Sequence, residues 1–225
     1  GLQGGFGSVL LGRDKTPFYR LTEDTSADSI SDFSTTNLVG LKRVNGVHYA
    51  GNFSGVGVSA MGGYHNQEVN GTDTIDYKAY GLGLSYATGP FMVGIAGEKS
   101  EDSAVVNGLE QTNYGIGGTY DFTAAKLFAN YLVNQDQYGN GPKSKDKEAN
   151  IGVKVPFGAA SLVAEYGYND GENYDGHDFN IGANYAFSKR TDVYARAARI
   201  NDYDVDNNGG SGKDTKYAVG LRHKF

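Results

Sequence analysis

The amino-acid sequence predicts an all-β protein, a transmembrane antiparallel up-and-down β-barrel with about 12 strands. Three observations predict this fold. Apolar and polar residues alternate along most of the chain, short and long connections alternate between the strands, and the acidic residues gather in the long connections. A barrel strand needs only about 9–11 residues to cross a membrane, so the fold does not require a long apolar run.

The alternation has period 2, which is the period of side chains along a β-strand. In "YGLGLSY", for example, Tyr80, Leu82, Leu84 and Tyr86 alternate with Gly and Ser. The same pattern recurs at residues 56–64, 91–97, 114–120, 151–155, 162–168, 179–187 and 217–225. The predicted strands start near Phe6, Lys42, Val56, Tyr77, Phe91, Asn113, Lys126, Ala149, Ala160, Asp178, Thr191 and Thr215.

One strand departs from the pattern, and no helix competes with it. In the strand from Lys126, Phe128 and Leu132 interrupt the face that should be polar. A short turn at "SADSISDF" (residues 26–33) is the one interruption of the strand pattern that resembles helix.

The connections differ in length and charge. Short ones are expected at residues 51–55, 88–90, 121–125, 156–159 and 188–190, and long ones at 14–41, 64–77, 98–112, 134–148, 168–178 and 200–214. In a meander this alternation places all short turns at one end and all long loops at the other. The long segments hold 23 of the 26 acidic residues but only 7 of the 20 Lys and Arg.

Aromatic residues near both strand ends indicate which face meets lipid. Such pairs form the girdles of membrane barrels, and a sheet in lipid must close on itself because it cannot leave edges unpaired. A soluble β-sandwich also alternates polar and apolar residues, but the one-sided loops and the number of strands favour a barrel. The pairs are Tyr80/Tyr86, Phe179/Phe187 and Tyr217/Phe225.

Composition argues against several other functions. The chain has no Cys, so it has no disulfide or thiolate metal site, and its pI of about 5.2 opposes nucleic-acid binding. "DVDNNG" (residues 204–209) resembles the start of a calcium loop, but Thr215 stands where the bidentate Glu belongs, so we predict no metal and no cofactor. An outer-membrane phospholipase would need a lipid-facing His beside a Ser; His223 has that parity but lies at the expected periplasmic rim, and no G-x-S-x-G motif is present. We therefore predict that the protein is not an enzyme.

Four stretches carry a resemblance to the Gram-negative general porins, which form trimeric outer-membrane barrels of 16 strands. They are "GGFGSVLLGRDKTPFY", "GVHYAGNFSGVGVSA", "YGLGLSYATGPFMVGIAG" and the terminal "YAVGLRHKF". The resemblance implies that residues 1–225 are one barrel domain that lacks the signal peptide and the first four strands; a true 12-stranded barrel remains the alternative. It also implies that Phe225 is an assembly signal for the barrel-insertion machinery.

The resemblance implies a functional site as well. The long segment 14–41 would fold into the barrel, with Glu23, Asp24, Asp28 and Asp32 facing the pore, although an ordinary solvated acidic loop is the alternative. A basic wall would face it. Strand parity turns His48 and Lys42 inward, while the family pattern suggests Arg43. Other inward positions by parity are Lys126, Lys154, Glu165, Arg196, Arg222 and Lys224.

The expected function is passive diffusion of ions and small hydrophilic solutes across the outer membrane of a Gram-negative bacterium. A solute-specific porin and a non-conducting structural or adhesive barrel remain alternatives. The expected partners are outer-membrane lipid, lipopolysaccharide bridged to the acidic loops by divalent cations, and two further copies of the chain. The acidic loops predict a mild preference for cations.

Overall fold

A computed structural model describes residues 1–225 except 29–32, 70–72, 103–107, 173, 205–210 and 225. Within the described residues, 13 strands form one antiparallel sheet in which each strand pairs with its sequence neighbours. The strands are β1 (Leu2–Gly4), β2 (Gly7–Lys15), β3 (Arg43–Phe53), β4 (Val56–Val69), β5 (Asp73–Thr88), β6 (Phe91–Asp102), β7 (Leu109–Asp121), β8 (Lys126–Tyr138), β9 (Lys143–Phe157), β10 (Ala160–Asp170), β11 (Tyr174–Ala186), β12 (Thr191–Asp204) and β13 (Ser211–His223). The predicted up-and-down barrel topology is confirmed.

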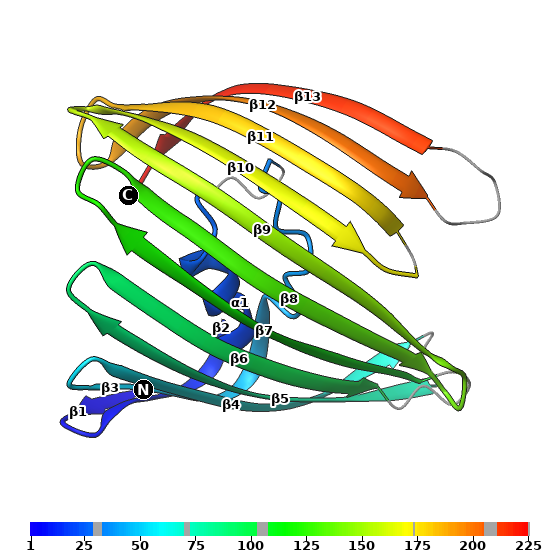
Figure 1. Ribbon diagram of the computed structural model, residues 1–225. Coiled ribbons are helices and arrows are strands. Elements are labelled where there is room, and N and C mark those ends of the chain that lie inside the picture. Colours follow the sequence, from blue (N-terminus) through cyan, green and yellow to red (C-terminus); the bar gives the residue numbers. More distant parts are fainter. Residues whose placement is uncertain (29–32, 70–72, 103–107, 173, 205–210, 225) are drawn as a thin grey trace.

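The sheet curls into a barrel wall whose two edges are β1 and β13 (Figure 1). The strands β2 to β13 correspond to the 12 predicted strands. The additional strand, β1, has three residues and pairs with β2 through Leu2 and Val9. It was missed because three residues are too few to show a period.

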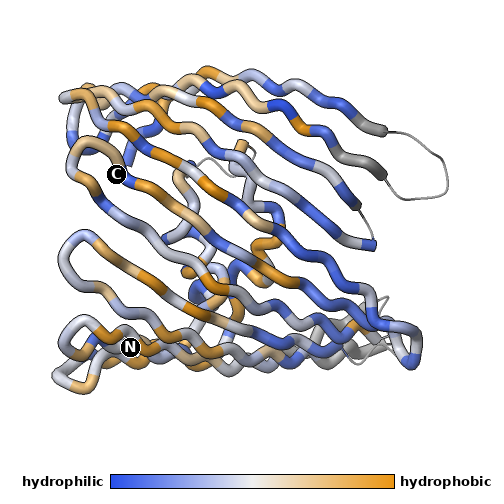
Figure 2. Tube along the Cα trace, viewed as in Figure 1, coloured by the Kyte–Doolittle hydropathy of each residue, from blue (hydrophilic) through white to orange (hydrophobic). Residues whose placement is uncertain are grey.

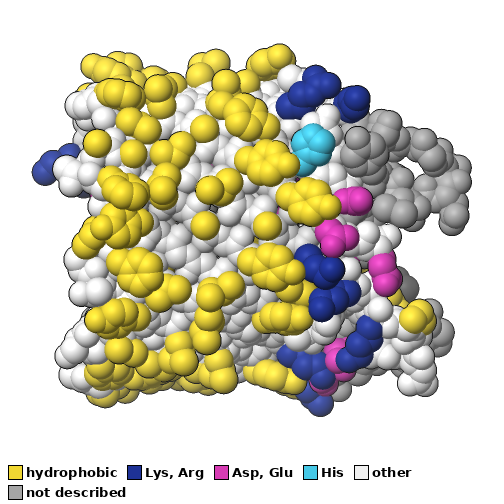
Figure 3. Space-filling view, in the orientation of Figure 1, with side chains coloured by type: hydrophobic (Ala, Val, Ile, Leu, Met, Phe, Trp, Pro, Cys, Tyr) yellow, Lys and Arg dark blue, Asp and Glu magenta, His cyan; other side chains and the backbone are white. Residues whose placement is uncertain are grey.

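The two faces of the sheet differ as the alternation predicts. On the convex face, Leu82, Ile116 and Ile181 are 68%, 49% and 47% exposed. Hydrophobic side chains cover most of this face, and charged ones gather near the ends of the strands on the right (Figure 3). Along the strands, apolar residues occupy the middle and left while polar residues dominate towards the right (Figure 2). A broad apolar band of this kind matches the hydrocarbon layer of a membrane.

Most of the predicted long loops are extensions of strands. For example, the loop expected at 134–148 is mostly β8 and β9, which leave only residues 139–142 between them. The prediction was wrong because the hydrogen-bonded ladder continues beyond the apolar band, where no lipid-facing residues mark the alternation. Among the predicted long connections, the one between β2 and β3 remains long.

That connection contains a helix the sequence analysis missed, α1 (Pro17–Asp24). Thr16 caps it, since its Oγ1 accepts a hydrogen bond of 3.0 Å from the Tyr19 amide, and Pro17 occupies the first helical position, where no backbone donor is needed. The helix begins nine residues before the predicted turn at 26–33, and part of that turn lies outside the described residues. With only eight residues, α1 depends on packing for its stability. The described helix is too short to span a membrane.

Candidate functional site

The helix α1 and the coil after it lie within the curve of the sheet (Figure 1). We name them together the inner segment, described at residues 16–28 and 33–42. Phe18 and Leu21 of α1 are buried in a cluster with Ala96 on β6 and Leu132 on β8. Leu132 is one of the apolar residues that interrupted the polar face in the sequence. The interruption therefore marks the place where α1 packs on the inner wall.

Three wall carboxylates hold the backbone of the coil. Glu98 Oε1 accepts from the Leu41 amide at 2.6 Å, and Glu148 Oε2 accepts from two consecutive amides, at 2.8 Å from Asn37 and 3.0 Å from Leu38. Glu165 Oε1 accepts from the Asp28 amide at 2.8 Å. These carboxylates lie on β6, β9 and β10, so the coil is fixed across several strands.

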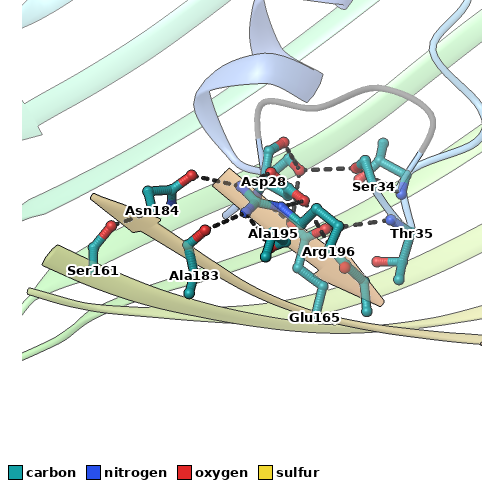
Figure 4. A network of polar contacts seen from close by, with 12 residues as sticks. Asp28, Ser34, Thr35, Ser161, Glu165, Ala183, Asn184, Ala195 and Arg196 are labelled. Carbon is teal, nitrogen blue, oxygen red and sulfur yellow. Dashed lines mark hydrogen bonds and ion pairs between the residues drawn. The ribbon is translucent and has the colours of Figure 1, made fainter. Parts of the chain in front are cut away.

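A buried ion pair joins Asp28 of the coil to Arg196 of β12 (Figure 4). Arg196 Nε donates to Asp28 Oδ2 at 2.6 Å, and Nη2 donates to Oδ1 at 2.8 Å. The other three N–H groups of the guanidinium reach the Ala183 and Ala195 carbonyls and Asn184 Oδ1. All five donors are thus used, and the ion pair is buried from solvent on both sides.

Asparagine side chains complete the polar lining under the segment. Asn130 donates to the Thr25 carbonyl at 3.3 Å, and Asn180 donates to Asp28 Oδ2 at 2.8 Å. Asn150 in turn donates to Asn130 Oδ1 at 2.9 Å. The wall therefore presents donors to the segment's oxygens and acceptors to its amides.

The four predicted loop carboxylates lie in different environments. Glu23 is exposed and forms an ion pair with Lys15 at 2.6 Å. Asp28 forms a buried ion pair with Arg196, so its charge is neutralised. Asp24 reaches solvent, and desolvation, together with the neighbouring Glu23, raises its pKa above the usual value. Asp32 lies outside the described residues.

The residues predicted to line the pore also divide into two groups. His48, Glu165 and Arg196 point inward but are buried, and His48 Nε2 lies 2.9 Å from the Val44 carbonyl oxygen. The remaining ones keep contact with solvent, and Phe225 lies outside the described residues. This second group comprises Lys42, Arg43, Lys126, Lys154, Arg222 and Lys224.

Four of the solvent-accessible charges can be placed on the wall and beside the inner segment. Lys126 and Lys154 are direct partners across β8 and β9, and the Lys126 ammonium lies 5.1 Å from the Phe128 ring centre. Arg222 pairs with Asp192 at 3.0 Å near the short-turn end. Lys42 borders a cavity of about 260 Å³ that Glu23 also lines. Basic groups thus border the space beside the inner segment.

Sequence reasoning missed the anchoring carboxylates Glu98 and Glu148. Both were assigned to acidic loops, yet their strand parity places them on the same inward face as Ala96 and Asn150. Inward parity was therefore the available signal. The "DVDNNG" stretch lies almost wholly outside the described residues, and in the described part no group of three His, Cys, Asp or Glu could hold a metal ion.

The sheet topology and the segment folded against its inner face define a porin barrel. Residues 1–206 match the family model of the Gram-negative porin, and the chain belongs to this family. It is an outer-membrane protein of Gram-negative bacteria.

Curated relatives are consistent with this assignment. An outer membrane porin protein of Bordetella pertussis is 28% identical over 181 residues, which are 66% of this chain and 46% of that protein. The major outer membrane protein P.IB of Neisseria meningitidis serogroup B is 26% identical over 248 residues, covering 100% of this chain and 70% of the relative. The chain thus spans under half of the first relative and about two thirds of the second.

Solved structures show the same fold. An anion-selective porin from Comamonas acidovorans superposes with a TM-score of 0.85 at 21% identity, over 99% of this chain and 76% of that one. The trimer form of OmpT from Vibrio cholerae gives a TM-score of 0.72 at 16% identity, over 97% of this chain and 77% of the other.

Proposed function

We propose that the chain forms the wall of a water-filled pore through which ions and small hydrophilic solutes diffuse passively, and that the inner segment narrows this pore. The observation that carries the proposal is the fixing of the segment across the inner wall, by Glu98, Glu148, Glu165 and Arg196. Because the segment is held by buried contacts on several strands, the cross-section of the pore stays constant. Selection by size and charge then needs no cofactor and breaks no bond.

The charges near the segment would act on solutes as they pass. Lys126 and Lys154 are the basic side, and Glu23 and Asp24 are the exposed acidic side. Opposed charges across a narrow passage orient dipolar solutes and set the ion preference. Asp28 contributes to the position of the segment and little to the field in the pore, because its charge is neutralised at contact distance.

Planar-bilayer recording of the purified chain tests this function. The parent protein should give discrete conductance steps, and a variant in which residues 18–38 are replaced by a short Gly-Ser linker should give larger steps. A parent that inserts into the bilayer and conducts nothing would favour a structural or adhesive barrel. Block that saturates with one solute would indicate a solute-specific porin.

We further propose a homotrimer that contacts lipopolysaccharide. OmpT of Vibrio cholerae has a trimer form, and the convex face carries charged groups beyond the apolar band, among them Lys99, Glu101 and Glu110 in one ion-pair network. Divalent cations would bridge the carboxylates to anionic lipid. Insertion through the barrel-assembly machinery, with Phe225 as its signal, belongs to the same proposal. Cross-linking in detergent and in lipopolysaccharide-containing bilayers, with and without a chelator, tests it.

A further inference from the structure

Six glycines on the inner face lie where the inner segment and Arg196 approach the wall. They lie on six different strands, and we name them the wall glycines: Gly83 on β5, Gly94 on β6, Gly117 on β7, Gly152 on β9, Gly167 on β10 and Gly182 on β11. Glycine in a strand interior weakens the strand, because it adds conformational entropy to the unfolded chain and offers no side chain to pack. Six of them on one face therefore call for a compensating role.

At three of the wall glycines, an added Cβ would collide with the inner segment. A Cβ on Gly117 would lie 2.7 Å from the Thr25 side chain, and one on Gly152 would lie 2.8 Å from the Ala27 Cβ. A Cβ on Gly167 would lie 2.5 Å from Asn150 Oδ1 of the wall and 2.9 Å from both the Cβ and the carbonyl oxygen of Thr35. Real Cβ atoms do not approach so closely, so a larger residue at these three positions displaces the segment and, at Gly167, the Asn150 side chain as well.

The remaining wall glycines continue the pattern at either end. A Cβ on Gly83 would lie 2.6 Å from the Ser59 Oγ of β4 and 3.1 Å from the Pro17 Cβ, and one on Gly94 would lie 3.1 Å from the Leu21 Cδ1. At the far end, a Cβ on Gly182 would enter the space filled by the Arg196 guanidinium. The wall glycines thus follow the inner segment from the start of α1 to the ion pair of Asp28 with Arg196 on β12.

The strand register places the central wall glycines in one row of direct partners across the strands. Gly94 pairs with Gly117, Gly117 pairs with Asn130, Asn130 with Asn150, and Asn150 with Gly167. Along this row of five strands, the inner wall therefore carries only glycines, which have no side chain, and asparagines, whose side chains are short. Above and below this row, the wall carboxylates hold the segment by its amides.

We propose that the wall glycines are positioning residues for permeation: they form a recess whose depth sets how far the inner segment stands into the pore. The inference rests on the proposed function for its consequence in conductance, but the recess itself can be tested without any current. The width of the pore would then depend on wall positions that no permeating solute touches. The wall glycines act together with the wall carboxylates: the glycines leave room for the inner segment, and the carboxylates bind its backbone amides.

A cysteine reporter tests the recess directly, because the chain has no Cys of its own. Thr35→Cys suits this purpose: Thr35 is 1% exposed, and in the described part of the chain its hydroxyl has no hydrogen-bond partner to lose. In the folded barrel the reporter should react slowly with a maleimide. Adding Gly167→Ala should raise the labelling rate by about ten-fold or more, because the coil can no longer rest against β10.

The matched control is Gly62→Ala. Gly62 is also a strand glycine, on β4, but a Cβ there would meet nothing within 4 Å. It should leave the labelling of Thr35→Cys unchanged. Equal labelling in the Gly167→Ala and Gly62→Ala variants would overturn the proposal.

A size exchange separates positioning from general damage to the fold. Gly152→Ala collides first with the Ala27 Cβ, so adding Ala27→Gly should restore the seating of the segment. In bilayers, Gly152→Ala should lower the single-channel conductance by roughly 1.5-fold or more as the segment moves inward, and the exchange should bring it back. A conductance that Gly152→Ala leaves at the parent value, or that the exchange fails to restore, contradicts the proposal. Absence of current in every variant, with the labelling differences intact, would refute the pore and leave the recess standing.

Discussion

Arg196 and Asp28 are the residues whose loss should damage the site most. A buried ion pair with one partner removed leaves an uncompensated charge, which costs about 3–5 kcal/mol. Arg196→Met should therefore lower the free energy of unfolding by that amount. Removing both charges, in Arg196→Met with Asp28→Asn, should recover a large part of it. Because the chain has no Trp, circular dichroism in detergent is the suitable probe of unfolding.

Arg222 provides the matched control for this prediction. It also pairs with an aspartate, Asp192, at 3.0 Å, but its side chain is 39% exposed whereas that of Arg196 is 2% exposed. Partly exposed pairs contribute about 0–1 kcal/mol, so Arg222→Met should have a small effect. Similar losses in the two single variants would show that burial of the Asp28 pair is not what fixes the segment.

At the scale of elements, α1 depends on a small apolar contact in an otherwise polar interior. Leu132 is fully buried against Phe18 and Leu21, and Leu→Ala at such a site costs about 2–5 kcal/mol. We expect Leu132→Ala to release α1 from the wall, so that a cysteine placed at Phe18 becomes reactive to a maleimide. Leu82→Ala is the control, because Leu82 is 68% exposed on the convex face. Protection of the cysteine at Phe18 in the Leu132→Ala variant would contradict this account.

Sequence could predict those features of the elements that depend on a period. Lipid-facing residues such as Leu82 and Ile116 follow from alternation, because a strand exposes every second side chain to a uniform apolar solvent. The ends of the strands beyond Glu98 and Glu148 could not be predicted in this way, because both faces there meet water or polar groups; only parity counted from the apolar band indicated that the two side chains point inward. The helix α1 was missed because eight residues show barely two helical turns. Phe128 and Leu132 were visible as exceptions, but their partner could not be known.

The same limit applies to the candidate site. Parity placed Arg196 and Glu165 inward, yet a solvated lumen residue and a buried anchor have the same parity. What separates them is the inner segment, whose path across the wall depends on contacts far apart in sequence, such as Asp28 with Arg196. The wall glycines were visible as the polar-face partners of the lipid-facing residues. Their role depends on the segment that fills the space above them.

For the whole molecule, the balance of acidic and basic side chains that reach solvent differs from the balance of their numbers in the sequence. The acidic connections predicted a mild cation preference, and that prediction has not been tested. Glu98, Glu148 and Glu165 lie at most 4% exposed beneath the segment, and Asp28 is neutralised by Arg196. In the proposed pore, four carboxylates are therefore largely shielded from passing ions. The lysines beside the path are not shielded in this way.

Lys126 and Lys154 should therefore influence the ion preference more strongly than the shielded carboxylates do. They are direct partners on β8 and β9, and Lys154 is exposed. Removing both charges in Lys126→Gln with Lys154→Gln should shift the reversal potential in a KCl gradient towards cation preference. The shift should shrink as salt rises, because exposed charges are screened beyond about 10 Å at 0.1 M. Lys145→Gln removes a charge from the opposite, outward-facing side of β9 and should leave the potential unchanged. If Lys145→Gln shifts the potential as much as the lysine pair does, the ion preference arises from the field of the whole surface and not from the charges beside the inner segment.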